Sequence, residues 1–124
     1  MEVWLAAAAV SGFVGVAAGA FGAHGLEGRA GAEELAAFET GARYQMYHAL
    51  ALFAVAWLAD RLPDATSVMV AGWAFVAGTV LFSGSLYVLG LTGSRALVMV
   101  TPVGGLVFLV GWASLLVAAL SSRG

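Results

Sequence analysis

Four long runs of apolar residues, separated by short polar stretches, restrict what this chain can fold into. The runs cover residues 3–21, 44–59, 68–91 and 96–120. A helix needs about 20 predominantly apolar residues to cross the ~30 Å hydrocarbon core of a bilayer. Because backbone polar groups inside that core must be satisfied within the protein, such runs favour helices. They predict an all-α integral membrane protein, in which four transmembrane helices form a four-helix bundle and residues 1–124 form a single transmembrane domain.

Composition supports this class of protein. Of 124 residues, 62% are hydrophobic and 10% are charged, and a water-soluble domain of this size would not expose so much apolar surface. All five basic residues are arginines scattered along the chain, so no basic patch exists to hold nucleic acid, and the expected partner is the lipid bilayer. The absence of cysteine excludes disulfides, thiolate metal sites and cysteine nucleophiles.

The segments between the runs predict connections of two kinds. Residues 25–42 mix glutamates and an arginine with alanines, which predicts a partly helical interfacial loop between the first two spans. The sequences DRLPD at 60–64 and TGSR at 92–95 contain residues that end helices and favour water, so they predict short turns.

Two further patterns concern the helices themselves. Ser11, Gly15 and Gly19 recur at every fourth position, and small residues at this spacing allow two helix backbones to approach closely in lipid. In the fourth run, Pro102 follows Thr101 and precedes two glycines, which predicts a kink or local unwinding because proline removes a backbone donor.

A polar stretch, TGARYQMYHAL at residues 40–50, stands at the start of the second apolar run. His48 precedes Asp60 by twelve residues, or about 18 Å along a helix, so we expect His48 to lie inside the ~30 Å hydrocarbon core. On a helical wheel Met46 stands opposite one broad arc of polar side chains, which we expect to face protein or a cavity because unsatisfied polar groups are costly in lipid. The residues of this arc are Arg43, Tyr44, Gln45, Tyr47 and His48.

Other polar side chains are expected near the same membrane boundary. His24 ends the first run, a serine-rich stretch ends the third, and Thr101 lies early in the fourth. Donors of this kind at headgroup depth suit a lipid or quinone headgroup. The candidate ligand-binding residues are His24, Arg43, Tyr44, Gln45, Tyr47, His48, Ser83, Ser85, Tyr87 and Thr101.

Cofactor and catalytic sites are not predicted. His24 and His48 could approach each other across adjacent helices, and with Glu27 or Glu39 they could bind a metal, or alone they could ligate haem. The chain has no H-x-x-x-H, E-x-x-H or C-x-x-C-H motif to support either site. No nucleophile with an adjacent base can be assembled, so we expect a protein that is not an enzyme.

Three interpretations of the polar cluster stay open. The favoured one is a non-enzymatic module that binds a lipid, a quinone or a partner membrane complex. The second is a small transporter or channel, working as a homo-oligomer; proton-coupled transport normally needs an intramembrane carboxylate, and every Asp and Glu lies outside the apolar runs. The third is a hydrogen-bonded network that stabilises the bundle and binds no ligand.

Several motifs together resemble one known family. They are GAFGAHGL at 19–26, TGARYQMYHALAL at 40–52, LFSGSLYVLGLTG at 81–93, and TPVGG followed by GW between 101 and 112. In this order they resemble the YgdD-like family of small membrane proteins, a domain-of-unknown-function family with bacterial and mitochondrial relatives. The resemblance implies a multi-pass, four-span protein of the bacterial inner membrane, and it implies no particular activity.

Overall fold

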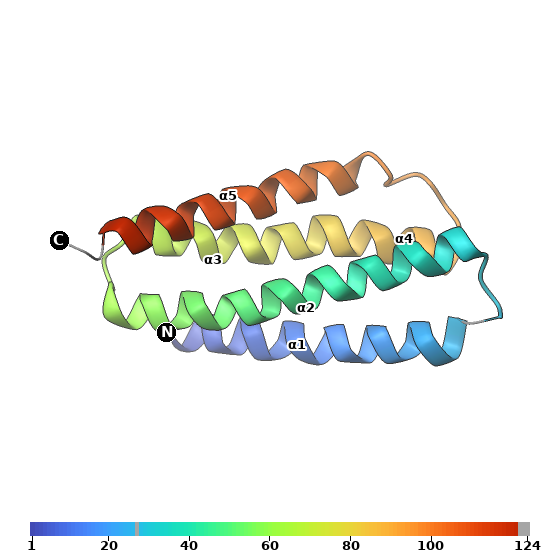
Figure 1. Cartoon of the computed structure of the whole chain (residues 1–124), viewed down its shortest axis with the longest axis horizontal. Coiled ribbons are helices and arrows are strands. Elements are labelled where there is room, and N and C mark those ends of the chain that lie inside the picture. The colour runs from blue at the N-terminus through green and yellow to red at the C-terminus, as the bar shows by residue number, and fades with distance from the viewer. Residues whose placement is uncertain (27, 122–124) are drawn as a thin grey trace.

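The computed structural model describes residues 1–26 and 28–121, and this part of the chain is helical apart from short connections. Two of the helical segments are π-helical, and each continues an α-helix. The elements are α1 (Glu2–Phe21), η1 (Gly22–Leu26), α2 (Ala32–Arg61), α3 (Thr66–Gly78), η2 (Thr79–Ser83), α4 (Gly84–Thr92) and α5 (Val100–Ser121) (Figure 1).

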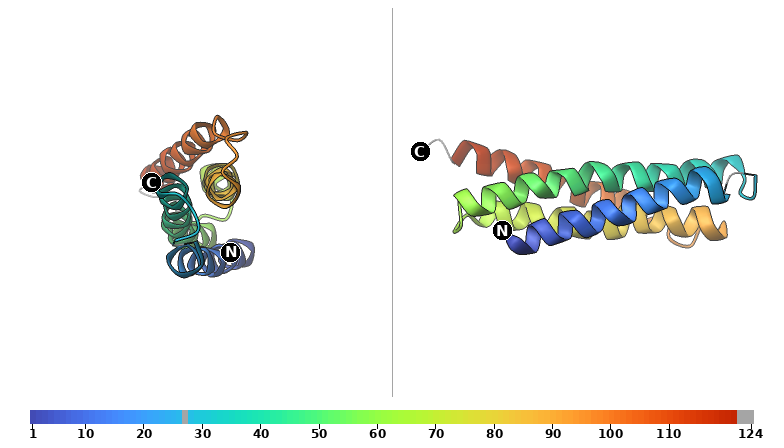
Figure 2. Two further views of the ribbon diagram at one scale, coloured as in Figure 1. Left: turned by 90° about the vertical axis from the view of Figure 1, so that its right-hand side faces the viewer. Right: turned by 90° about the horizontal axis from the view of Figure 1, so that it is seen from below.

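These elements form four rods that run side by side in alternating directions. The segments α3, η2 and α4 make one continuous rod, and the N-terminus lies at the same end of the bundle as the end of α5 (Figure 1). Helix α1 packs against α2, α2 packs against the α3–η2–α4 rod, and that rod packs against α5, as the end-on view shows (Figure 2). The predicted all-α bundle is confirmed.

Within the described residues, three helical stretches are long and apolar enough to cross a membrane. They are Glu2–Leu26, Thr66–Thr92 and Val100–Ser121. The remaining rod, α2, has 30 residues and is therefore about 45 Å long, but its polar first half lowers its hydropathy. Its passage through the bilayer beside the other three rods stays a prediction.

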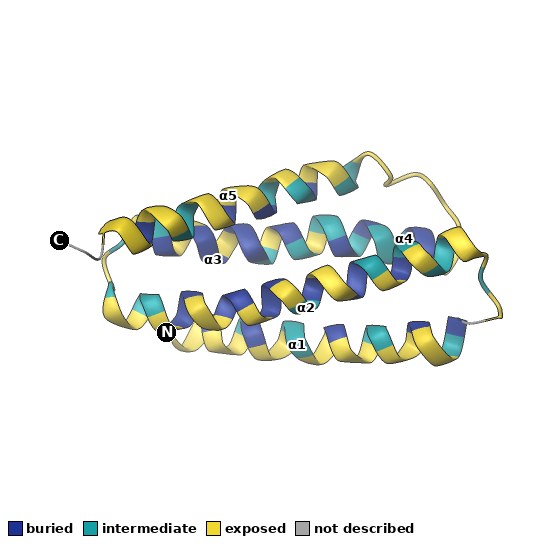
Figure 3. Cartoon of the chain, viewed as in Figure 1, coloured by how far each residue is buried: buried dark blue, intermediate teal, exposed yellow. Residues whose placement is uncertain are grey.

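The outer surface of the bundle is apolar, as hydrocarbon surroundings require. Large side chains such as Phe13 (77% exposed) and Met99 (76%) stand on the outside, while Phe75 and Val55 are fully buried between the rods. Figure 3 shows the buried residues as stripes along the inner faces of the helices. A surface of this kind is stable in lipid and would be an aggregation site in water.

Two helix boundaries differ from the prediction. Helix α2 begins at Ala32, so residues 32–43 are a continuous part of the second rod and the loop before it is short. Helix α5 begins at Val100 instead of residue 96, which puts Pro102 in its first turn. A proline there removes no hydrogen bond, because the first N–H groups of a helix have no intrahelical acceptor. The predicted kink in the fourth span is therefore wrong.

The small residues of α1 form the expected close contact with α2 over part of their length. A Cβ added at Gly15 would lie 2.7 Å from the sulfur of Met46, and one at Gly12 would lie 4.0 Å from Cβ of Ala49, so the two helices meet tightly here. A Cβ at Gly19 would meet nothing within 4 Å. The predicted seam is thus confirmed at Gly15 and is wrong at Gly19.

The π-helical turn η2 in the third rod was not predicted from the sequence. Thr79, its first residue, donates from Oγ1 to the carbonyl of Phe75 at 2.8 Å. The turn ends at Ser83, which is fully buried against α2. Single π-turns inside α-helices often occur at functional sites, and this one lies directly beside the polar side chains of α2.

Candidate functional site

The polar arc of α2 divides between the interior and the surface of the bundle. Gln45 and His48 are buried, at 5% and 4% exposure, whereas Arg43, Tyr44 and Tyr47 are exposed. Because successive residues turn by about 100° around a helix, the five side chains span about 200°, which is more than one face can bury. Gln45 and His48 face the interior, as expected; Tyr44 and Tyr47 line an open groove described below, and Arg43 lies exposed on another face of α2.

Gln45 joins three rods at the centre of the bundle. Its Nε2 donates to the carbonyl of Ser11 on α1 at 3.0 Å, and its Oε1 accepts from the hydroxyl of Tyr87 on α4 at 2.5 Å. Both ends of the buried amide are therefore satisfied. The spacing of Ser11, Gly15 and Gly19 predicted the face of α1 that packs closely on another helix, but it did not predict the hydrogen bond from Gln45 to Ser11.

Three further candidates, Ser83, Ser85 and Thr101, bond to neighbouring helices or turns. Ser83 donates from Oγ to the carbonyl of Gly41 on α2 at 2.7 Å. The hydroxyls of Ser85 and Thr101 lie 2.5 Å apart and link α4 to the first turn of α5. Among the described residues, no buried side-chain nitrogen or oxygen lacks a hydrogen-bond partner. The hydroxyls of Ser83, Ser85 and Thr101 thus form hydrogen bonds within the chain.

His48 has both ring nitrogens engaged. Nδ1 lies 2.7 Å from the carbonyl oxygen of Tyr44, and Nε2 lies 3.1 Å from the indole Nε1 of Trp112 on α5. A carbonyl only accepts and an indole only donates, so the hydrogen resides on Nδ1 and the ring is neutral. The ring also stacks on Phe108, with centroids 3.6 Å apart and planes within 5°. The neutral ring of His48 therefore has no nitrogen free for a ligand.

Above His48, a groove of about 400 Å³ opens between α2 and α5; we call it the α2–α5 groove. Aromatic rings make up most of its walls, and Gly105 leaves room for a further ring, since a Cβ there would meet only Phe82, at 3.9 Å. The groove is open toward the outside, because Tyr47 is 51% and Trp112 46% exposed. Its lining residues are Tyr44, Tyr47, His48, Phe82, Gly105, Phe108, Leu109 and Trp112.

The rim of the α2–α5 groove holds two unused hydrogen-bond donors. In the described part of the chain, the phenol hydroxyls of Tyr44 and Tyr47 bond to no other residue. Tyr44 stands sixteen residues, or about 24 Å, from Asp60, and helical side chains lean toward the helix N-terminus. Both phenols are therefore expected to point toward the boundary opposite Asp60, away from His48 and Trp112. The groove has a polar rim and an apolar floor.

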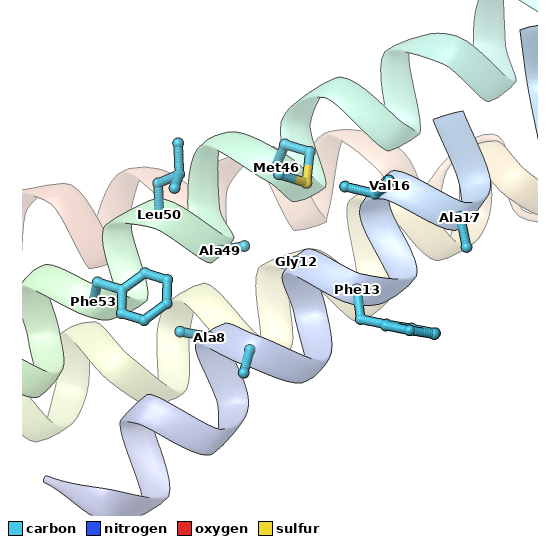
Figure 4. A pocket seen from close by; sticks show the side chains of 10 residues that line it. Ala8, Gly12, Phe13, Val16, Ala17, Met46, Ala49, Leu50 and Phe53 are labelled. Carbon is cyan, nitrogen blue, oxygen red and sulfur yellow. The ribbon is translucent and has the colours of Figure 1, made fainter. Parts of the chain in front are cut away.

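A larger groove, of about 510 Å³, lies on the outer side of α1 and α2 (Figure 4). Its side chains, among them Phe13, Val16, Leu50 and Phe53, offer no hydrogen-bond donor. Such a surface suits the acyl chain of a bilayer lipid but has no group to orient a headgroup. The α2–α5 groove is therefore the better candidate site.

The structure does not bring the two histidines together. His24 is exposed in η1 beside Gly22, and a Cβ at Gly22 would meet Phe38 of α2, which precedes His48 by ten residues, or about 15 Å. Glu27 lies outside the described residues, and no group of three histidine or acidic side chains within them could hold a metal ion.

Arg43 lies away from the α2–α5 groove, on the face of α2 beside Glu39 and Gly19. Its guanidinium makes no ion pair within the described residues. Trp112, in contrast, was not a candidate, although its indole fixes His48 and lines the groove. A membrane-embedded tryptophan with its polar N–H was the available signal, but its partner stands 64 residues away in the sequence.

Comparison with known proteins gives consistent matches. The family model described as "Protein of unknown function (DUF423)" matches residues 18–105. The UPF0382 membrane protein YwdK of Bacillus subtilis is 48% identical over 120 residues, covering 97% of this chain and 98% of that protein. The UPF0382 inner membrane protein YgdD of Escherichia coli is 48% identical over 117 residues, covering 91% of this chain and 86% of that protein. No solved structure gives a significant match.

Proposed function

This chain belongs to the DUF423 family, and we propose that it is a non-enzymatic module that binds the ring of a quinone-type lipid in the α2–α5 groove. The observation that supports this most directly is the pairing of an aromatic floor with two unbonded phenols at the rim. A quinone ring is flat and apolar on its faces and carries two carbonyl acceptors on its edge. It would stack on the walls while Tyr44 and Tyr47 donate to a carbonyl.

The location of the groove supports a lipid-soluble ligand. Its side opening faces the same surroundings as the exposed apolar side chains of α5, such as Leu106 and Leu109, at 64% and 63% exposure. An isoprenoid tail could therefore remain in the bilayer while the ring enters from the side. A water-soluble ligand would have to cross this apolar surface first, at a high desolvation cost.

The buried polar residues have a supporting role in this proposal. Gln45, Tyr87 and Ser83 hold α2 against the neighbouring rods, and Trp112 holds His48 flat against Phe108. A fixed wall binds a planar ring with a smaller loss of conformational entropy than a mobile one. We thus propose that the hydrogen bonds of Gln45 stabilise the bundle and that the phenols of Tyr44 and Tyr47 bind the ligand.

We place the protein in the bacterial inner membrane as a multi-pass protein. The relatives in Bacillus subtilis and Haemophilus influenzae are named membrane proteins, and the Escherichia coli relative is named an inner membrane protein. The transporter interpretation gains no support from the interior of a single chain, where Gln45 bonds to both Ser11 and Tyr87.

Quinone retention by the purified protein tests the proposal. The chain would be extracted from bacterial membranes in mild detergent, and bound isoprenoid quinone would be measured by chromatography and mass spectrometry. We expect about one quinone per chain at saturation. Removing one phenol in Tyr44→Phe or Tyr47→Phe should weaken binding about threefold to tenfold, the effect of one hydrogen bond, without a large change in thermal stability.

Phe53→Leu is the matched control, because Phe53 lines the larger apolar groove and leaves the α2–α5 groove unchanged. It should retain quinone at the level of the unsubstituted chain. Equal losses in Phe53→Leu and Tyr47→Phe, or no quinone in any preparation after quinone is added, would contradict the proposal.

A further inference from the structure

A second cavity lies at the end of the bundle opposite Asp60, where the loop before α2 meets the end of α4. Its volume is about 400 Å³, and charged groups stand in its wall. The lining includes Arg29, Glu34 and the final turn of α4, Gly90 to Thr92, with the following Gly93. We call it the end pocket.

Close packing brings the negative end of α4 to the start of α2. A Cβ added at Gly90 would lie 3.0 Å from the carbonyl oxygen of Glu34, so the absence of a side chain allows this approach. Gly93, with φ of +71°, ends α4 in the left-handed conformation that glycine adopts readily. Its N–H bonds to the carbonyl of Leu89, and the last carbonyls of α4 have no backbone partner among the described residues.

The charged groups of the end pocket have opposite signs. The carboxylate of Glu34 and the C-terminal carbonyls of α4 favour a cation. Arg29 supplies a guanidinium that makes no ion pair within the described residues. The neighbouring Arg95 is already bonded to Glu33 at 2.6 Å, and this bond raises the pKa of Arg95 and keeps it charged. A ligand with both an anionic and a cationic group matches this arrangement.

We propose that the end pocket binds the zwitterionic headgroup of an aminophospholipid, with the phosphate on Arg29 and the ammonium on Glu34 and the α4 carbonyls. The pocket lies where two apolar stretches, Glu2–Leu26 and Thr66–Thr92, both end, which is headgroup depth for a lipid of the surrounding bilayer. Guanidinium groups bind phosphate through paired hydrogen bonds, and a primary ammonium has three donors for carboxylate and carbonyl oxygens. The site is separate from the α2–α5 groove and does not depend on quinone binding.

Retention of defined lipids by the full chain tests this site. Native mass spectrometry would count phosphatidylethanolamine, phosphatidylglycerol and phosphatidylcholine bound to the protein after exchange into detergent with each lipid. We expect phosphatidylethanolamine to be retained about tenfold more strongly than the other two, the effect of losing one charge-assisted hydrogen bond. Stepwise N-methylation of the ethanolamine should lower retention at each step.

Two substitutions test the phosphate contact and the ammonium contact separately. Arg29→Gln should lower retention of phosphatidylethanolamine and phosphatidylglycerol alike, because both lose the phosphate contact. Glu34→Gln should remove the preference for phosphatidylethanolamine while leaving phosphatidylglycerol unchanged. Gln is close to Glu in size and in helix propensity, so folding should be kept. Arg61→Gln, at the other end of the bundle, is the control and should change nothing.

Equal retention of the three lipids by the unsubstituted chain would overturn the proposal. So would a methylation series without effect, which needs no variant and therefore cannot be confused with a folding defect. Soluble glycerophosphoethanolamine should not displace the lipid at equal concentration, because it lacks the acyl chains. If glycerophosphoethanolamine displaced the lipid at equal concentration, the pocket would bind a soluble ligand instead of a lipid, and the proposal would also be overturned.

Discussion

The indole Nε1 of Trp112 donates a hydrogen bond to Nε2 of His48 across 3.1 Å, joining α5 to α2. Apart from such side-chain contacts the two helices hardly meet, because α5 packs mainly against the α3–η2–α4 rod. The bond fixes the tautomer of His48, and the stacked Phe108 fixes the plane of its ring. One wall of the α2–α5 groove is therefore rigid before any ligand enters.

Trp112→Phe tests the contribution of this bond to stability. The variant keeps an aromatic ring in the groove but leaves Nε2 of the buried His48 without its donor, which should lower the free energy of unfolding by about 1–3 kcal/mol. Denaturation in detergent, followed by the loss of helical circular dichroism, measures the change. Trp73→Phe is the matched control, since Trp73 is 58% exposed and its indole bonds to no described residue. Equal effects of the two substitutions would contradict the assignment.

A double-mutant cycle tests the Gln45–Tyr87 hydrogen bond. Tyr87→Phe and Gln45→Leu each leave a buried partner unsatisfied, so each should cost about 1–3 kcal/mol of unfolding free energy. The double variant should cost less than the two added together, because no unpaired group remains between positions 45 and 87. Strict additivity of the two costs, measured under the same denaturation conditions, would argue that the residues do not interact.

Adjacent glycines of α5 should respond differently to alanine. A Cβ at Gly104 would overlap the backbone of Phe82, which cannot rotate away, so Gly104→Ala should destabilise the bundle by about 1–3 kcal/mol. A Cβ at Gly105 would meet only the ring of Phe82 at 3.9 Å, and Gly105→Ala should be tolerated. Thermal unfolding of the two variants in one detergent compares them. If Gly105→Ala were the more damaging change, the position of α5 would be different from that described.

Filling the α2–α5 groove should abolish binding without unfolding the chain. Gly105→Leu places a branched side chain in the open space beside Phe82, where a quinone ring would otherwise lie. We expect quinone retention to fall at least tenfold while the melting temperature stays close to that of Gly105→Ala. Undiminished retention in Gly105→Leu would place the quinone elsewhere.

The general architecture could be predicted because run length and hydropathy decide which segments form helices in lipid. The burial of His48 between helices agrees with the inward-facing side expected for it, whereas its depth in the bilayer stays a prediction. The start of α5 could also have been read from the sequence, because Pro102 is typical of a first helical turn. The apolar run begins at residue 96, however, which put Pro102 inside the predicted helix and led to the predicted kink.

The arrangement of the site could not be predicted in the same way. The polar arc was wider than one helix face, so the sequence did not decide whether Tyr44 and Tyr47 or Gln45 would face the interior. The partners of Gln45 and His48 come from other helices and depend on which rods are neighbours. The π-turn η2 also has no recognised sequence signal, yet it helps to set the position of Phe82 in the groove.

Photocrosslinking with an azido-quinone in the native membrane tests the central proposal most directly, because it uses the unsubstituted chain. After illumination, peptide mass spectrometry would locate the adducts. We predict adducts concentrated at Tyr44–His48 and at Gly105–Trp112, and their suppression by excess unlabelled quinone. Adducts spread over the outer surface of α1, around Phe13 and Val16, with no suppression by unlabelled quinone, would contradict a quinone site in the α2–α5 groove.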